Sequence, residues 1–123
     1  MILDRPERIK EYTEKGWWDN LTVDDVFKNN VEKYPDFLAL IDPLNRDTFT
    51  TGDAQKFTFS EMDEKVNQLA TALLKAGIVK DDVVGLFLPN IWELIISFLA
   101  IARIGAIATV SYTHLTLPTI LRV

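Results

Sequence analysis

The stretch VVGLFLPNIWELIISFLAIARIGAIAT, residues 83–109, decides the fold. Residues 83–88 form a short apolar run with one glycine, a pattern typical of a strand covered on both faces. Pro89 ends this run because proline has no N–H to donate to a sheet. A second apolar run, residues 106–109, begins another strand.

A helix is expected between these strands, over residues 91–104, because the segment is long and apolar almost all the way round. Asn90 is the expected N-cap, and Glu93 would complete a capping box with it. Gly105 suits the C-terminal end of the helix. The stretch therefore predicts a right-handed strand–helix–strand unit in a parallel sheet. Gly85 is expected to mark close packing within its strand.

The composition of the 123 residues limits the classes of function. The net charge is −5 and no basic patch is present, so a nucleic-acid partner is not expected. The lack of cysteine excludes disulfides and thiolate chemistry. The helix over residues 91–104 is too short to span a membrane and carries Glu93 and Arg103, so a membrane partner is not expected. The start of the chain is unlike a signal peptide, which favours a cytoplasmic protein.

An N-terminal arm precedes the main domain. Residues 6–15 are expected to form a short surface helix, with Pro6 in its first turn and Gly16 at its end. Trp17 and Trp18 follow, and we expect their indoles to attach the arm to the domain surface. Stacking on a ligand is the alternative reading of the two indoles.

The next helix is expected over residues 23–34, with Thr22 as its cap and Pro35 after it. Asp24 and Asp25 suit its first turn because they face the positive end of the helix dipole. Its buried stripe is expected to comprise Val23, Val26, Phe27, Val31 and Tyr34.

A β-hairpin is expected next, with strands at residues 37–42 and 56–59. The connection between them, residues 43–53, is rich in turn-forming residues. Thr51-Gly52-Asp53 lies in it and is too short and too poor in glycine to bind phosphate.

A long helix is expected over residues 61–76, with Ser60 as its cap and Gly77 at its end. Its apolar stripe is expected to comprise Met62, Val66, Leu69, Ala70, Leu73 and Leu74. Its charged residues are expected to form a solvated face and not a site; they are Glu61, Asp63, Glu64, Lys65 and Lys75.

Several ordered segments resemble the AMP-forming adenylating enzymes, a superfamily of acyl- and aryl-CoA synthetases, luciferases and peptide-synthetase adenylation domains. Phe57-Thr-Phe-Ser-Glu-Met-Asp-Glu64 is similar to the family element Leu-Thr-Tyr-x-Glu-Leu, and residues 66–77 resemble the helix after it. Residues 83–90 resemble the family strand that ends in Pro-Asn, and residues 98–106 the helix end Leu-Lys-x-Gly-Ala. Residues 12–18 resemble the arm of the aryl- and acyl-acid branch.

The resemblance covers residues 8–109 and implies an α/β fold: the first part of the N-terminal large domain of an AMP-forming acyl-CoA synthetase, with a βαβ unit and an early β-hairpin. Such enzymes activate a small carboxylic acid with ATP and Mg to an acyl-adenylate and pyrophosphate, and most then transfer the acyl group to CoA. The family's phosphate loop, acidic residue and late lysine all lie beyond the matched part. The resemblance therefore assigns no catalytic, cofactor-binding or metal residue to this chain, and no ATP, Mg or CoA is expected to bind it.

Two other classes remain open: part of a peptide-synthetase-type adenylation domain, and a small non-enzymatic α/β interaction module. The arm that ends in Gly16-Trp17-Trp18 favours a stand-alone ligase over the first of these. The tail described next argues against the second.

The resemblance stops after Thr109, and residues 110–123 are expected to be a non-native tail. Val110 to Thr119 is the translation of a transposase adapter read as GTC TCT TAT ACA CAT CTG ACG CTG CCG ACG. The constant GTGTAG of that adapter would encode Val123 and the stop codon. The family could also place Val110 and Ser111 here, so both origins stay open for these two residues.

On this reading residues 1–109 are the N-terminal portion of the large domain, cut off from the rest. Because apolar faces meant for the rest of that domain would be exposed, the isolated chain is expected to aggregate. A monodisperse, cooperatively unfolding monomer would contradict that expectation. His114 falls within the tail and has no expected role.

Overall fold

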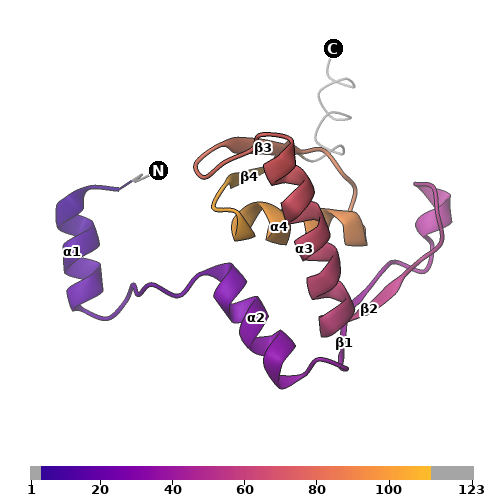
Figure 1. Ribbon diagram of the computed structural model, residues 1–123, viewed down its shortest axis with the longest axis horizontal. Coiled ribbons are helices and arrows are strands. Elements are labelled where there is room, and N and C mark those ends of the chain that lie inside the picture. The colour runs from indigo at the N-terminus through magenta and orange to yellow at the C-terminus, as the bar shows by residue number, and fades with distance from the viewer. Residues whose placement is uncertain (1–3, 112–123) are drawn as a thin grey trace, which may run out of the picture.

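The computed structural model describes residues 4–111 (Figure 1). Its elements, in chain order, are α1 (Pro6–Glu14), α2 (Val23–Lys33), β1 (Leu38–Ile41), the 3-10 helix η1 (Arg46–Thr48), β2 (Lys56–Thr58), α3 (Phe59–Lys75), β3 (Val83–Leu86), α4 (Trp92–Arg103) and β4 (Ile107–Val110).

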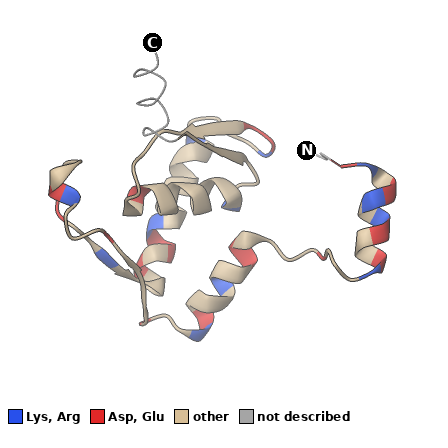
Figure 2. Cartoon of the chain, turned by 180° about the vertical axis from the view of Figure 1, so that it is seen from behind, with Lys and Arg blue, Asp and Glu red and all other residues tan. Residues whose placement is uncertain are grey.

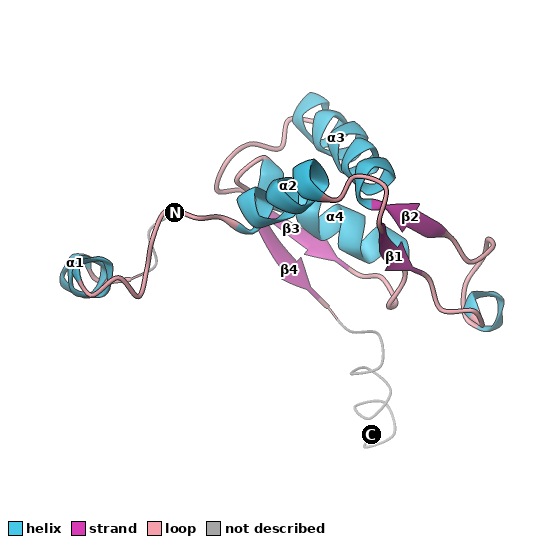
Figure 3. Ribbon diagram, turned by 90° about the horizontal axis from the view of Figure 1, so that it is seen from below, coloured by secondary structure: helices cyan, strands magenta, loops and turns pink. Residues whose placement is uncertain are grey.

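The predicted strand–helix–strand unit is confirmed. β3 pairs in parallel with β4, from Val83 opposite Ile107 to Leu86 opposite Val110, and α4 connects the two strands (Figure 3). The pairing extends one residue past β4, where the N–H of Ser111 donates to the carbonyl of Leu86 at 2.8 Å. The predicted hairpin is also confirmed, since β1 and β2 pair antiparallel.

The expectation that β3 is covered on both faces is wrong for the described residues. Leu86 is buried, whereas Val83 and Gly85 are exposed, so one face of the strand lacks a covering layer within residues 4–111. The expected close packing at Gly85 is wrong for the same reason, because no atom lies within 4 Å of the position that a Cβ would occupy.

The core lies where α3 crosses α4 and where both helices meet the first strands. Val66 of α3 and Ala100 of α4 are completely buried, and Met62 and Ile96 are nearly so. The apolar stripe predicted for α3 is thus largely confirmed, with the exception of Leu74, which is exposed at the end of the helix.

The start of α3 differs from the prediction by two residues. Thr58 is the N-cap, because its hydroxyl accepts from the N–H of Glu61 at 3.2 Å and the Glu61 carboxylate accepts from the N–H of Thr58 at 2.8 Å. Ser60 therefore lies inside the helix. The Thr-x-x-Glu spacing that forms this capping box begins in the last residue of β2.

The stripe predicted for α2 is only partly correct. Phe27 is buried and Val31 packs against the core, but Val23, Val26 and Tyr34 are exposed. Tyr34 stacks on the ring of Phe37 at a centroid distance of 5.3 Å but remains exposed, so only Phe27 and Val31 of the predicted stripe reach the core. Thr22 caps the helix as predicted, in a capping box with Asp25.

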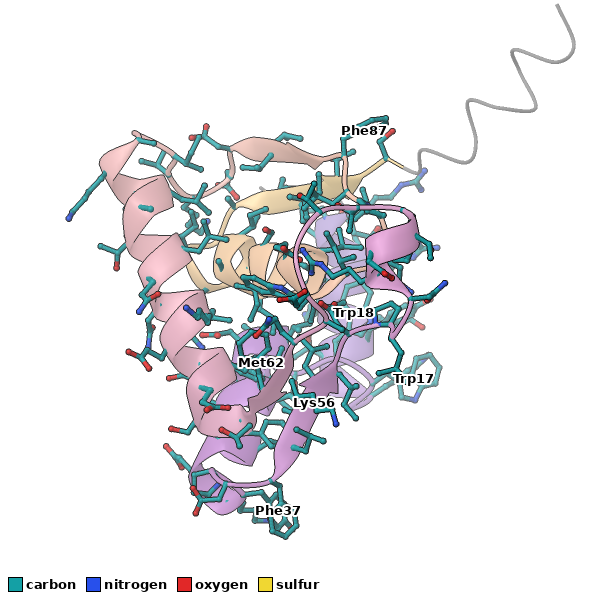
Figure 4. All side chains as sticks on the ribbon, turned by 90° about the vertical axis from the view of Figure 1, so that its right-hand side faces the viewer. Trp17, Trp18, Phe37, Lys56, Met62 and Phe87 are labelled. Carbon is teal, nitrogen blue, oxygen red and sulfur yellow. The ribbon has the colours of Figure 1, made fainter. Side chains whose placement is uncertain are left out.

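The N-terminal arm stands apart from the body of the molecule, with α1 well separated from the other helices (Figure 1). The expectation that the two indoles attach it to the domain surface is wrong. Trp17 and Trp18 instead pack on Tyr12 of the arm itself, at ring-centroid distances of 5.3 and 5.0 Å. Both indoles are exposed, as Figure 4 shows for Trp17 at the edge of the molecule.

Candidate functional site

A ligand would be expected at the edge where β3 and β4 end, because ligands of open α/β sheets bind outside the carboxyl ends of the strands. Both strands are parallel, so their carboxyl ends lie at the same edge, and α4 begins there after the turn that follows β3. Figure 2 shows α4 as almost uncharged between an acidic start and a basic end, which are Glu93 and Arg103.

An ion cluster built on a buried arginine–aspartate pair lies at the start of α4. We call it the Arg46 cluster; it comprises Asp42, Arg46 and Glu93. Asp42 follows β1, Arg46 begins η1 and Glu93 lies in the first turn of α4. Arg46 Nη1 donates to Asp42 Oδ2 at 2.7 Å and to Glu93 Oε2 at 2.8 Å. The Arg46 residue is only 5% exposed, although the sequence suggested no role for it.

All the donors of the Arg46 guanidinium have partners inside the chain. Nε and Nη2 donate to the carbonyl of Thr51 at 3.2 and 3.1 Å, and Nη2 also contacts Glu93. The guanidinium has five N–H groups, and this arrangement leaves none for a phosphate or carboxylate ligand. The Arg46 cluster therefore anchors the loop between β1 and β2 to α4 and is not a binding site. The pKa of Arg46 is raised, chiefly by its hydrogen bonds to Glu93 and Asp42.

Asp42 also caps α4. Its Oδ1 accepts from the backbone N–H of Trp92 at 2.8 Å, whereas α4 has no cap from a neighbouring side chain. The predicted Asn90–Glu93 capping box is therefore wrong, because Glu93 binds Arg46 and Asn90 is exposed. A carboxylate already occupies the positive end of this helix, so the end is not available to a phosphate group.

Burial alone raises the pKa of the Asp42 carboxyl, but hydrogen bonds from Arg46 and from the backbone N–H groups of Trp92 and Gln55 outweigh it. The net effect holds the pKa of Asp42 below its usual value. This carboxylate is consequently fixed in its charged form at neutral pH and is unsuited to act as a general acid or base.

The described residues show no other constellation that could carry out chemistry. Within residues 4–111, no group of three or more His, Cys, Asp or Glu side chains could hold a metal ion. A hollow between α3 and α4 is lined mostly by apolar atoms, and its polar lining residues are Lys65, Gln68, Glu93 and Ser97. Since Glu93 is bound to Arg46, this lining presents no pair of nucleophile and base.

A second ion cluster, the Arg103 cluster, corrects two expectations about charged residues. It comprises Arg103 of α4, Asp24 of α2, and Asp63 and Asn67 of α3. Asp24 was expected only to face the positive end of the α2 dipole, but it is also buried in an ion pair with Arg103. Asp63 was expected on a solvated face, but it too pairs with Arg103. No local pattern could reveal these contacts, because Asp24 and Arg103 lie 79 positions apart in the sequence.

Comparison with known proteins identifies relatives of this chain. Residues 27–123 match the family model described as AMP-binding enzyme. The propionate–CoA ligase of Salmonella typhimurium is 40% identical over 81 residues, which are 66% of this chain and 12% of that protein. The salicyl-AMP ligase / salicyl-S-ArCP synthetase of Mycobacterium tuberculosis is 32% identical over 101 residues, or 82% of this chain and 17% of that protein.

Solved structures of other proteins have a fold similar to that of this chain. The apo structure of Mycobacterium smegmatis MbtA matches 87% of this chain and 19% of its own, with a TM-score of 0.70 and 25% identity. The N-terminal subdomain of Klebsiella oxytoca NpsA matches 75% of this chain and 22% of its own, with a TM-score of 0.62 and 28% identity. The chain thus spans less than a quarter of each of these four proteins. Among the described residues, no helix is long and apolar enough to cross a membrane.

Proposed function

Because the chain belongs to the AMP-binding enzyme family, we propose that it forms the first part of the large domain of an ATP-dependent ligase for a small carboxylic acid. The parent enzyme would convert the acid and ATP to an acyl-adenylate and pyrophosphate, and then form an acyl-CoA and AMP. The observation that supports this most directly is the match of residues 27–123 to the family, with a fold similar to an N-terminal subdomain of NpsA.

The part of the chain that the structure describes supplies scaffold to such an enzyme. Arg46 donates to two carboxylates and to a backbone carbonyl, and Arg103 donates to two carboxylates and a side-chain amide. Residues 4–111 offer no cluster of ligands for Mg. ATP, Mg and CoA would therefore be held by parts of the parent enzyme outside this chain, and the chain alone would be inactive. A cytoplasmic location is part of this proposal, since the reaction consumes cytoplasmic ATP and CoA.

The thiol that receives the acyl group is the point on which the relatives differ. The propionate–CoA ligase is named for CoA, whereas the salicyl-AMP ligase is named for a carrier protein, ArCP. We favour CoA as the acceptor, and the experiment below includes a carrier protein as the other acceptor. A non-enzymatic interaction module is not favoured, because the matched relatives are named as enzymes.

The first experiment is to sequence the source DNA across codons 105–130 from an unfragmented amplicon. We propose that the reading frame continues past Thr109 and that residues 110–123 derive from a sequencing adapter. Residues 112–123 of this segment lie outside the described part of the chain. A genome that encodes Val110 to Val123 followed by a stop codon would refute the adapter origin.

The complete gene then allows a test of activity. We expect acid-dependent ATP–pyrophosphate exchange from the full enzyme, followed by thioester formation with CoA, and no exchange from residues 1–123 alone. A full enzyme without exchange for any aliphatic or aromatic acid would refute the proposed ligase. Exchange with transfer only to a carrier protein would keep adenylate formation and exclude CoA as the acceptor.

A further inference from the structure

Few side chains attach α2 to the body of the molecule: Phe27 and Asp24 are buried, and Val31 is partly buried against the core. Phe27 inserts into the core, where its ring lies 6.3 Å from that of Phe59. Asp24 is the other buried residue of the helix. Val23 and Val26 remain exposed, so burial of apolar surface holds this helix less firmly than it holds α3.

The Arg103 guanidinium provides the polar part of this attachment. Its Nε donates to Asp24 Oδ1 at 2.8 Å, its Nη2 to Asp63 Oδ1 at 2.7 Å and its Nη1 to Asn67 Oδ1 at 2.6 Å. The Arg103 side chain is only 9% exposed, and its guanidinium carbon lies 5.9 Å from the centre of the Phe27 ring. One side chain of α4 thus joins α2 to α3.

The chain on either side of α2 is held differently. After the helix, the carbonyls of Pro35 and Phe37 accept hydrogen bonds from Ser60 and Phe59 at the start of α3, each at 3.0 Å. Before the helix, the arm makes its aromatic contacts within itself and stands apart from the body (Figure 1). Residues 4–34 are therefore connected to the body through Phe27 and Val31, the Arg103 cluster, and Tyr34, whose ring stacks on that of Phe37.

We propose that Arg103 is a latch that holds α2 against α3 and α4, and that α2 opens as a flap hinged at Tyr34 when the latch is broken. The arm moves with α2, because it continues directly from the start of this helix. We expect α3 and α4 to stay packed during this opening, since Val66, Ile96 and Ala100 come from these two helices and α2 adds only Phe27 and Val31 to the same core. Local opening of this kind is expected where few buried contacts hold an element.

Hydrogen exchange of residues 1–123 at low protein concentration tests the latch, with peptides from α2, α3 and α4 followed separately. Asp24→Asn removes the α2 carboxylate at constant size and leaves Arg103 bound to Asp63 and Asn67. It also removes the ion pair of Asp24 with Lys28 of the same helix, a surface pair that contributes little, so Lys28→Gln is measured beside it and should not change exchange. We expect opening of α2 to increase about tenfold to hundredfold, as for the loss of a hydrogen bond to a charged group. Peptides from α3 and α4 should stay within about twofold of wild type.

Glu32→Gln is the matched control, because it removes a carboxylate from the exposed side of the same helix. We expect it to leave exchange in all three helices unchanged. The proposal is overturned if Asp24→Asn behaves like this control, or if exchange rises equally in α3 and α4, since the helix would then not open separately.

Arg103→Lys provides a second test from the other side of the contact. Lysine keeps the positive charge but cannot bind Asp24, Asp63 and Asn67 at once through a planar fork. We expect α2 to lose protection in this variant as it does in Asp24→Asn. If α2 in Arg103→Lys is as protected from exchange as in the wild type, the planar guanidinium is not needed to hold the helix, and the proposal is wrong.

Discussion

Replacement of Asp42 by alanine should destabilise the fold far more than replacement of Asn90 by alanine. Both residues are candidates for the cap of α4: Asp42 lies just after β1, far away in the sequence, and Asn90 lies in the turn next to the helix. In the structure only Asp42 binds the N–H of Trp92, and it also accepts from Arg46. The comparison therefore separates a cap supplied by the tertiary structure from a cap supplied by the neighbouring sequence.

The size of the effect follows from the contacts that each change removes. A hydrogen bond to a charged group contributes about 1.5–3 kcal/mol, and a helix cap contributes about 1 kcal/mol. Asp42→Ala loses both, and its side chain is fully buried, so we expect a loss of about 3 kcal/mol in the free energy of unfolding. Asn90 is exposed and caps nothing, so Asn90→Ala should change the free energy by less than about 0.5 kcal/mol.

Urea unfolding at a protein concentration low enough to prevent aggregation, followed by far-ultraviolet circular dichroism, measures both values. Asp42→Asn adds an intermediate case. Asparagine keeps an oxygen for the Trp92 N–H but loses the charge that faces Arg46, so its cost should lie between the other two. The reasoning fails if Asn90→Ala is as destabilising as Asp42→Ala, because the cap would then be local.

The pH dependence of the same pair provides an independent check. The pKa of Asp42 is lowered in the folded chain, so its contribution is complete above the ordinary carboxyl pKa of about 4 and is lost as the pH falls through the lowered value. The stability difference between the wild type and Asp42→Ala should therefore shrink below about pH 4. If the difference in the free energy of unfolding stays constant down to pH 2, the charge of Asp42 contributes nothing to stability.

Three further predictions concern stability, each measured by urea unfolding. Thr58→Ala should cost about 1 kcal/mol because Thr58 caps α3, whereas Ser60→Ala should stay within about 0.5 kcal/mol; equal costs would contradict the observed start of the helix. Ile101→Ala should cost about 2–5 kcal/mol because the side chain is 1% exposed, and a smaller loss would mean that α4 is not central to the core. Gly105→Ala should cost about 1–2 kcal/mol because its φ is +75°, while Gly85→Ala should be tolerated because its Cβ would meet no atom within 4 Å; the reverse order would argue against this backbone.

Local patterns were sufficient for the elements whose signals lie within a few residues. The apolar run at residues 83–88, the proline after it and the long apolar segment beyond predicted the parallel strand–helix–strand unit, which the structure confirms. Gly105 was correctly placed at the end of α4, because the backbone there needs a positive φ that glycine adopts without strain. The ordered motifs also pointed to the family that the comparison identifies.

The burial of charged residues was decided only by how the elements pack. Arg46 lies in a loop whose sequence indicates a solvated turn, yet it is buried because Glu93 reaches it from 47 positions away. Asp24 and Asp63 carry typical signals of exposed helix residues, and both bind Arg103 from a third helix. The rules for caps and helix faces consider only neighbours within about one turn, so they assigned the cap of α4 to Asn90. The carboxylate that performs this role comes from the end of β1, which reaches Trp92 only after the hairpin has packed against the helix.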